Sequence, residues 1–251
     1  MNRWMLAALV LPLGACEVPD VAGIWGGLTS SLVAEGVILS VAPPDTNMDL
    51  SGSGFDSGMG FTAFLADAAQ VADLANAPIT GATVSLHGVA ADDQGEGVYT
   101  YAGTDLTYAE GETWQVKVDL AGDVATASVT LPPTVTVTIP QQHDANADLT
   151  VALAGQDYAT ALVVVYDLQA KAVTFSNEPK SISEVYQFTR GDAVEDIIIP
   201  GSAFAASSVY AVGVAGLNHT TAADLDQMNS ALSSIMAGQM KFYPVSTMVL
   251  P

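Results

Sequence analysis

Apolar and polar residues alternate along much of this chain, so that in several segments every second side chain is apolar. In residues 113–120, one Trp, two Val and one Leu take alternate positions, and polar or charged residues stand between them. Residues 134–139 repeat the pattern with Val and Ile alternating with Thr. Because successive side chains of a strand point to opposite faces, this period of two predicts strands with one buried and one solvent-exposed face.

A second series of apolar runs follows Pro140. Apolar residues alternate in residues 149–153, and residues 161–166 are continuously apolar, which is typical of a strand buried on both faces. Another long apolar run covers residues 209–217. Short strands separated by turns about every 8–12 residues indicate an all-β sandwich or barrel.

Residues 141–148 form a polar bridge that has no apolar alternation of its own. We place a domain boundary within this bridge. The expected parts are a signal peptide over residues 1–15, a tether over residues 16–35, and two β-sandwich domains over residues 36–140 and 141–251. The expected fold class is therefore all-β, with two β-sandwich domains in tandem.

Both halves of the chain share one longer pattern, an apolar residue followed by a polar or Gly-containing corner and then aromatic-x-Val-x-Val. It occurs in residues 106–118 and again in residues 199–214. The pattern resembles the corner between strands E and F of fibronectin type III and immunoglobulin-like (Ig-like) sandwiches. Residues 76–84 also resemble the Pro-x-x-Gly-Ala-x-Val turn and strand of bacterial Ig-like domains. The resemblance implies that both expected sandwiches are Ig-like.

Two stretches predict short accessory helices. In residues 221–236 five apolar residues recur at helical spacing, and Gly238 follows at a position that can end a helix. Thr221 and Asp224 resemble a capping box at its start. The Ala-rich residues 67–76 are the second candidate. We expect the first helix to cover one edge of a sandwich.

The composition is strongly acidic. The chain of 251 residues has 27 Asp and Glu against 6 Lys and Arg, which gives a formal net charge of −21. Since Lys and Arg supply most of the affinity for nucleic-acid phosphates, we expect no nucleic-acid partner. The chain has one cysteine, Cys16, so no internal disulfide can form and the hydrophobic core has to stabilise the fold.

The N-terminal residues follow the order of a secretory signal peptide, with Arg3, an apolar stretch and then small residues. Cys16 directly follows Leu-Gly-Ala at residues 13–15, and this motif resembles the lipobox of bacterial lipoproteins. The resemblance implies cleavage before Cys16 and a diacylglyceryl thioether on its sulfur, so that acyl chains bind the membrane. Glu17 stands where the sorting pattern of such lipoproteins has Asp for retention in the inner membrane. The expected location is therefore the cell envelope, at the outer membrane.

Two acidic stretches are candidate calcium sites, because Ca²⁺ takes oxygen ligands from carboxylates and amides. The first has a spacing similar to an EF-hand loop and contains Asp45, Asn47, Asp49 and Asp56. The second resembles the calcium-binding linkers of cadherin-like proteins and contains Asp144, Asn146 and Asp148. A solvated acidic loop or an Asx turn is the alternative explanation of each stretch.

No motif in the sequence indicates catalysis. His87, His143 and His219 lie in different segments, and neither Gly-x-Ser-x-Gly nor Ser-x-x-Lys occurs. We therefore interpret the protein as a non-catalytic binding or structural module with envelope proteins or polymers as partners. The alternatives are a lipocalin-like carrier of a small apolar ligand, because residues 23–25 are similar to the Gly-x-Trp of lipocalins, and an unrecognised envelope hydrolase.

Overall fold

The structure is a computed structural model that describes residues 31–44, 48–50, 53–55, 57–68, 77–179, 184, 188–189, 194–205 and 207–248. This part of the chain is built mostly of strands. They are β1 (Leu32–Val41), β2 (Gly58–Asp67), β3 (Thr83–Leu86), β4 (Val89–Ala90), β5 (Asp92–Gly95), β6 (Val98–Gly103), β7 (Thr113–Leu120), β8 (Asp123–Thr130), β9 (Gln142–Asp144), β10 (Leu149–Val151), β11 (Thr160–Asp167), β12 (Ala172–Ser176), β13 (Ile197–Ile199), β14 (Val209–His219), β15 (Leu225–Asp226) and β16 (Ser234–Met248).

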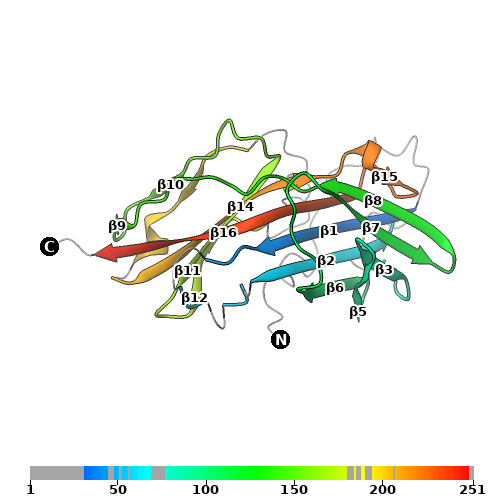
Figure 1. Ribbon diagram of the computed structural model, residues 1–251, viewed down its shortest axis with the longest axis horizontal. Helices are drawn as coiled ribbons and strands as arrows, with labels where there is room; N and C mark the ends of the chain where they lie inside the picture. The colour runs from blue at the N-terminus through cyan, green and yellow to red at the C-terminus, as the bar shows by residue number, and fades with distance from the viewer. Residues whose placement is uncertain are drawn as a thin grey trace.

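The main sheet has nine strands in the order β12-β11-β14-β16-β1-β2-β6-β5, with β9 as a further partner of β16. β16 lies in the middle of this sheet and extends through much of the long axis of the molecule (Figure 1). It pairs in parallel with β1 on one side and antiparallel with β14 on the other. With 15 residues, β16 is about 50 Å long.

The main sheet contains strands from both sides of the boundary that the sequence predicts in residues 141–148. The all-β class is confirmed. Two Ig-like β-sandwich domains in tandem are not confirmed, because β1 and β16, from opposite ends of the chain, are neighbours in one sheet. Alternation predicts which side chains a strand buries, but it does not specify which strands pair, so the local pattern could not show this arrangement.

Two hydrophobic cores share β16. The first contains Trp114 together with Ile235 of β16, and the second contains Phe204 together with Val245 of β16. Residues 235 and 245 are an even number of positions apart, so in a regular strand they point to the same face. Met236, which points to the opposite face, belongs to a third core. The chain thus has a core in each half, but one strand contributes to both.

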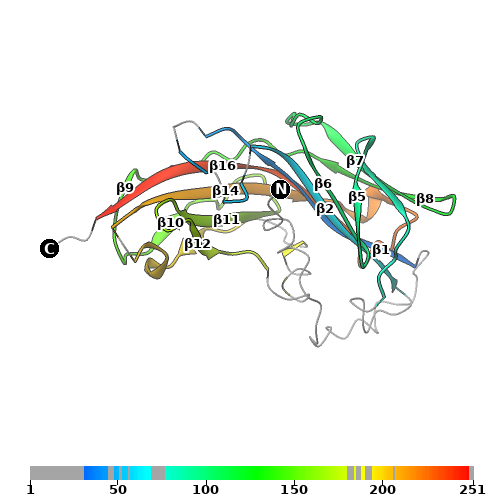
Figure 2. The ribbon, with the colours of Figure 1, turned by 90° about the horizontal axis from the view of Figure 1, so that it is seen from below.

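Separate layers cover the two cores. The five-stranded sheet β15-β8-β7-β3-β4 covers the first core, and the β10–β13 pair covers the second. Figure 2 shows β7 and β8 at one end of the molecule and β10 at the other. In β7, Trp114, Val116 and Val118 are buried and the residues before each of them are exposed, which confirms the alternation predicted over residues 113–120.

The continuously apolar runs at residues 161–166 and 209–217 form β11 and β14. All residues of β11 after Thr160 are buried. Val163 belongs to the second core and Val164 to the third, on the opposite face of the sheet. β11 is therefore buried on both faces, as its uninterrupted apolar sequence predicts.

The helix predicted over residues 221–236 is wrong. The capping box of Thr221 and Asp224 forms, but it begins only a short 3₁₀-helix, Ala222–Asp224, after which the chain pairs with β8 and then enters β16. Residues 235–237 are buried on both faces of the main sheet, and this hides the period of two that would have indicated a strand. Gly238 lies inside β16 and does not end a helix; a side chain at this position would collide with the backbone of Gly216 on β14.

The second helix candidate, residues 67–76, begins at the end of β2, and residues 69–76 lie outside the described residues. Residues 134–139 are extended, with Val135 buried and Thr136 and Thr138 exposed, but they belong to no sheet. The alternation there is confirmed, whereas pairing with a neighbouring strand is not found in the described part of the chain.

Candidate functional site

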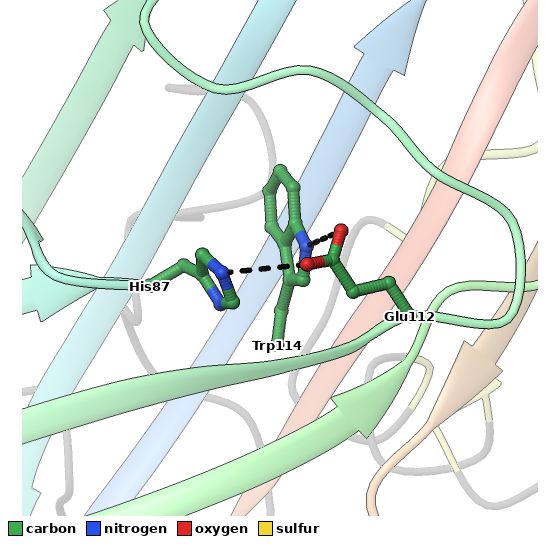
Figure 3. A network of polar contacts seen from close by, with 3 residues as sticks. All are labelled: His87, Glu112 and Trp114. Atoms are coloured by element: carbon green, nitrogen blue, oxygen red, sulfur yellow. Dashed lines mark hydrogen bonds and ion pairs between the residues drawn. The ribbon is translucent and has the colours of Figure 1, made fainter.

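The most connected polar cluster on the first half joins His87, Glu112 and Trp114 (Figure 3). Trp114 donates from Nε1 to Oε2 of Glu112 at 3.0 Å, and Nε2 of His87 lies 3.5 Å from Oε1 of the same carboxylate. The rings of His87 and Trp114 are stacked, with centroids 5.2 Å apart. Trp114 is buried, while the side chains of His87 and Glu112 are 38% and 42% exposed. The cluster therefore closes the first core at its surface.

Local structure explains why these residues meet. His87 occupies the turn between β3 and β4 with a φ of 47°, and its amide donates to the carbonyl of Gln115 on β7 at 2.7 Å. Glu112 precedes β7 and lies two residues before Trp114, which places both side chains on the same face. A buried indole needs an acceptor for its N–H, and this requirement is the sequence signal that could have predicted Glu112 as its partner.

The chemistry of this cluster is limited by what surrounds it. A nucleophilic mechanism needs a hydroxyl or thiol within hydrogen-bond reach of its base. Within the residues that the structure describes, no such group is bonded to His87. The His–carboxylate contact lies at the surface beside the buried indole, and the sequence pattern indicated surface or loop positions for all three histidines.

A second polar cluster consists of tyrosine hydroxyls that bind the backbone of the segment connecting the two halves. Tyr108 donates from its hydroxyl to the carbonyl of Pro132 at 2.5 Å, and Tyr158 donates to the carbonyl of Pro133 at 3.2 Å. Tyr243 of β16 donates in the same way to the carbonyl of Val135 at 3.4 Å. These hydroxyls reach the connecting segment from both halves, so its position is fixed relative to each core.

Burial keeps two of these tyrosines in the donating form. Removal from solvent raises the pKa of Tyr108, and the nearby side chains of Tyr158 and Glu110 raise it further. Burial also raises the pKa of Tyr158, again with a contribution from Glu110. Sequence reasoning did not find these residues. The signal was the Pro132-Pro133 pair, because prolines have no N–H to pair with a neighbouring strand, so that carbonyls of an unpaired stretch accept from side chains instead.

The second calcium candidate forms a tight turn after β9. Asp148 accepts a hydrogen bond at Oδ1 from the amide of Gly201 at 2.7 Å, and Asn146 has a φ of 64°. His143 lies against the same turn, with Nε2 at 2.9 Å from the carbonyl of Ala147. Asp144 is exposed at the end of β9. In this geometry Asp148 links the end of the turn to the amide of Gly201, and calcium binding by these residues stays a prediction.

The first calcium candidate lies largely outside the described residues, as does the lipidation site. Asp45, Asn47 and Asp56 are not described, and neither is Cys16. Asp49 is exposed, and the next residue, Leu50, belongs to the third core. Across the described ranges, no three His, Cys, Asp or Glu side chains lie close enough together to hold a metal ion.

A pocket of about 170 Å³ opens near the end of β14. Its lining mixes apolar and polar side chains: Val129, Thr130, Ala159, Asn218, His219, Thr221 and Asp224. Asp224 is already engaged, because its Oδ2 accepts from the amide and the hydroxyl of Thr221, both at 2.7 Å. Pockets for small ligands enclose about 300–1,000 Å³ and are mostly apolar. This pocket is smaller and more polar than the site expected for a carrier of apolar ligands.

Comparisons with known proteins add little to this geometry. No protein-family model matches the chain, and no curated protein matches its sequence. One similar solved structure is a chimeric titin Z1Z2 functionalized with a KLER exogenous peptide from decorin. The two chains are 12% identical over 89% of this chain and 97% of the other, with a TM-score of 0.21. A TM-score this low supports no conclusion about a common fold or function.

Among the described residues, no helix combines the length and the apolar sequence needed to cross a lipid bilayer.

Proposed function

We propose that this protein is a lipid-anchored lipoprotein of the cell envelope, in which the β-sheet body is a non-catalytic binding or structural module. The observation that carries the proposal is Cys16 directly after Leu-Gly-Ala at the end of a signal-peptide-like segment. Two or more acyl chains on one cysteine give stable anchoring, because each buried methylene contributes about 0.8 kcal/mol.

The charge of the chain is consistent with anchoring by acyl chains alone. A net charge of −21 repels anionic lipid headgroups, so the body itself has no electrostatic attraction to a membrane surface. The same charge keeps an apolar-rich chain soluble beside the membrane. With Glu17 after the cysteine, we propose the outer membrane as the location and envelope proteins or polymers as partners.

The second half of the body supports an Ig-like description. β16, β14, β11 and β12 form a sheet on one side of the second core, and β10 with β13 lies on the other. Two sets of strands that face each other across a shared core are a feature of such sandwiches. We propose that this half is Ig-like and that the first half is a second sandwich completed by β16.

The hydrolase alternative has less support. Its expected signature was a histidine beside a carboxylate or a serine in a cleft. His87 meets a carboxylate, but its side chain lies on the surface. His219 and Asp224 both line the pocket near β14, but Asp224 there accepts hydrogen bonds from the amide and the hydroxyl of Thr221.

The test is the fate of the full chain after Cys16→Ser. We expect the parent to be acylated and to fractionate with membranes, and the variant to stay unprocessed or to become soluble, since its hydroxyl cannot form the thioether. Ala15→Gly is the matched control, because it keeps a small residue before the cysteine and should be processed like the parent. A Cys16→Ser chain that is cleaved and recovered with membranes like the parent would show that the anchor proposal is wrong.

A further inference from the structure

We infer that two copies of this chain associate through residues 134–139, by antiparallel pairing of their backbones. All six residues of this segment are β-branched, and Pro133 and Pro140 bound it. Val135 is 2% exposed, and Val137 and Ile139 pack partly buried against the second core. The segment is therefore held in the conformation of a half-buried strand, with Thr136 and Thr138 on the solvent side.

The backbone of this segment pairs with no other backbone in the described part of the chain. The residues around it are bonded: Leu131 exchanges hydrogen bonds with Gly111 and Glu112, and the carbonyl of Gln141 accepts from Ser246. Between them, residues 134–139 form no backbone–backbone hydrogen bond with another described residue. Thr136 and Thr138 are the exposed residues of the segment, so theirs are the unpaired backbone groups that water reaches in the isolated chain. A row of free N–H and C=O groups on an extended segment is a template for another strand.

The tyrosine contacts identify which edge of the segment is free. The carbonyls of Pro133 and Val135 accept from Tyr158 and Tyr243, which belong to the second core. In an extended chain, the backbone groups of successive residues point to opposite edges. The N–H and C=O groups of Thr136 therefore point away from these tyrosines. The N–H and C=O groups of Thr138 also point away from these tyrosines. We assign this outward edge of the segment to pairing with the second copy.

The sequence of the segment favours a second copy as the occupant. Antiparallel pairing about Val137 places this residue opposite Val137 of the second copy and Val135 opposite Ile139. Thr136 then lies opposite Thr138. Apolar residues meet on the core side and threonines meet on the solvent side, and cross-strand pairs of both kinds stabilise sheets. The interface is self-complementary, as a two-fold dimer requires.

The distribution of charged residues also favours residues 134–139 as the interface. No Asp, Glu, Lys or Arg occurs between Asp123 and Asp144, although the chain carries a net charge of −21. Two copies repel each other elsewhere on their surfaces, and the uncharged segment is where they can approach. We therefore expect added salt to strengthen the dimer, because it screens the remaining repulsion.

Cysteine cross-linking tests the register. In the full chain carrying Cys16→Ser, the pair Thr136→Cys and Thr138→Cys should form a reducible covalent dimer under mild oxidation. The matched control is Thr126→Cys with Ser128→Cys, at the same spacing on β8, which has neighbouring strands on both sides. We expect no covalent dimer from the control, and equal cross-linking of both pairs would overturn the proposal.

Light scattering tests the association itself. The full chain in detergent should have twice the mass of one chain after correction for detergent. Thr136→Pro removes the N–H that pairs across the interface and should halve this mass, whereas Thr136→Val keeps the N–H and should not change it. Two results would contradict the inference. One is a parent with the mass of a single chain. The other is a Thr136→Pro chain that has an unchanged circular dichroism spectrum and still forms the dimer. If Thr136→Pro does not fold, the cysteine pairs decide the question.

Discussion

Because β16 contributes to two cores, we predict that both halves of the protein unfold together. Ile235 is fully buried in the first core, and Val245 is fully buried in the second. Ile235→Ala removes three carbon atoms and leaves a cavity, which should lower the free energy of unfolding by about 2–5 kcal/mol. Val245→Ala removes two methyl groups at about 0.8 kcal/mol each and adds a cavity term, so we expect about 2 kcal/mol.

Differential scanning calorimetry of the full chain measures the effect. In a domain of this size each kcal/mol lowers the melting temperature by about 2–4 °C, so Ile235→Ala should lower it by about 10 °C and Val245→Ala by about 6 °C. The parent and both variants should show one transition. Val124→Ala, at a side chain that is 41% exposed, is the control and should leave the melting temperature nearly unchanged. If the parent shows two transitions and each variant lowers the melting temperature of only one of them, the prediction that both halves unfold together is wrong.

Two further predictions concern single carboxylates. Asp196 accepts hydrogen bonds at Oδ1 from the amides of Ala154 and Leu153, and these bonds lower its pKa below the ordinary 3.8. The stabilisation is therefore present above pH 3.8 and is lost as the pH falls through the lowered pKa. Asp196→Asn should melt below the parent at neutral pH and together with it in acid; a difference that persists in acid contradicts this assignment. Asp148→Ala should lower the free energy of unfolding by about 1 kcal/mol, because the amide of Gly201 loses its acceptor. Denaturant titration with and without Ca²⁺ checks this, and a loss confined to the calcium-containing samples would show that Asp148 acts as a metal ligand and not as the acceptor for Gly201.

The sequence predicted β7, whose two faces differ, and the continuously apolar β11 and β14, but it missed the start of β16. In β7 the alternation of Trp114, Val116 and Val118 with polar residues was enough, because one face of that strand meets water. Residues 235–237 are buried on both sides, so their apolar run fitted a helix as well as a strand. The capping box of Thr221 and Asp224 was a correct local signal, but the chain after it pairs with β8.

The candidate sites show the same limit. The contact between His87 and Glu112 depends on the pairing of β3 with β7, which joins residues that are distant in the sequence. The partner of β1 is more distant still, since Glu35 lies opposite Ser234. Local patterns report the environment of a side chain and carry no information on partners at such separations.

The parallel pairing of β1 with β16 also determines the order in which the protein can fold. During synthesis β1 and β2 emerge long before β16, so Ile38 of the first core stays without its strand partner Ala237 until residues 234–248 have been made. Contacts with large sequence separation slow folding, and the open edge of β1 is exposed to aggregation meanwhile. A nascent or truncated chain that ends before Ser234 therefore holds an unfinished sheet, and we expect such a chain to depend on chaperones.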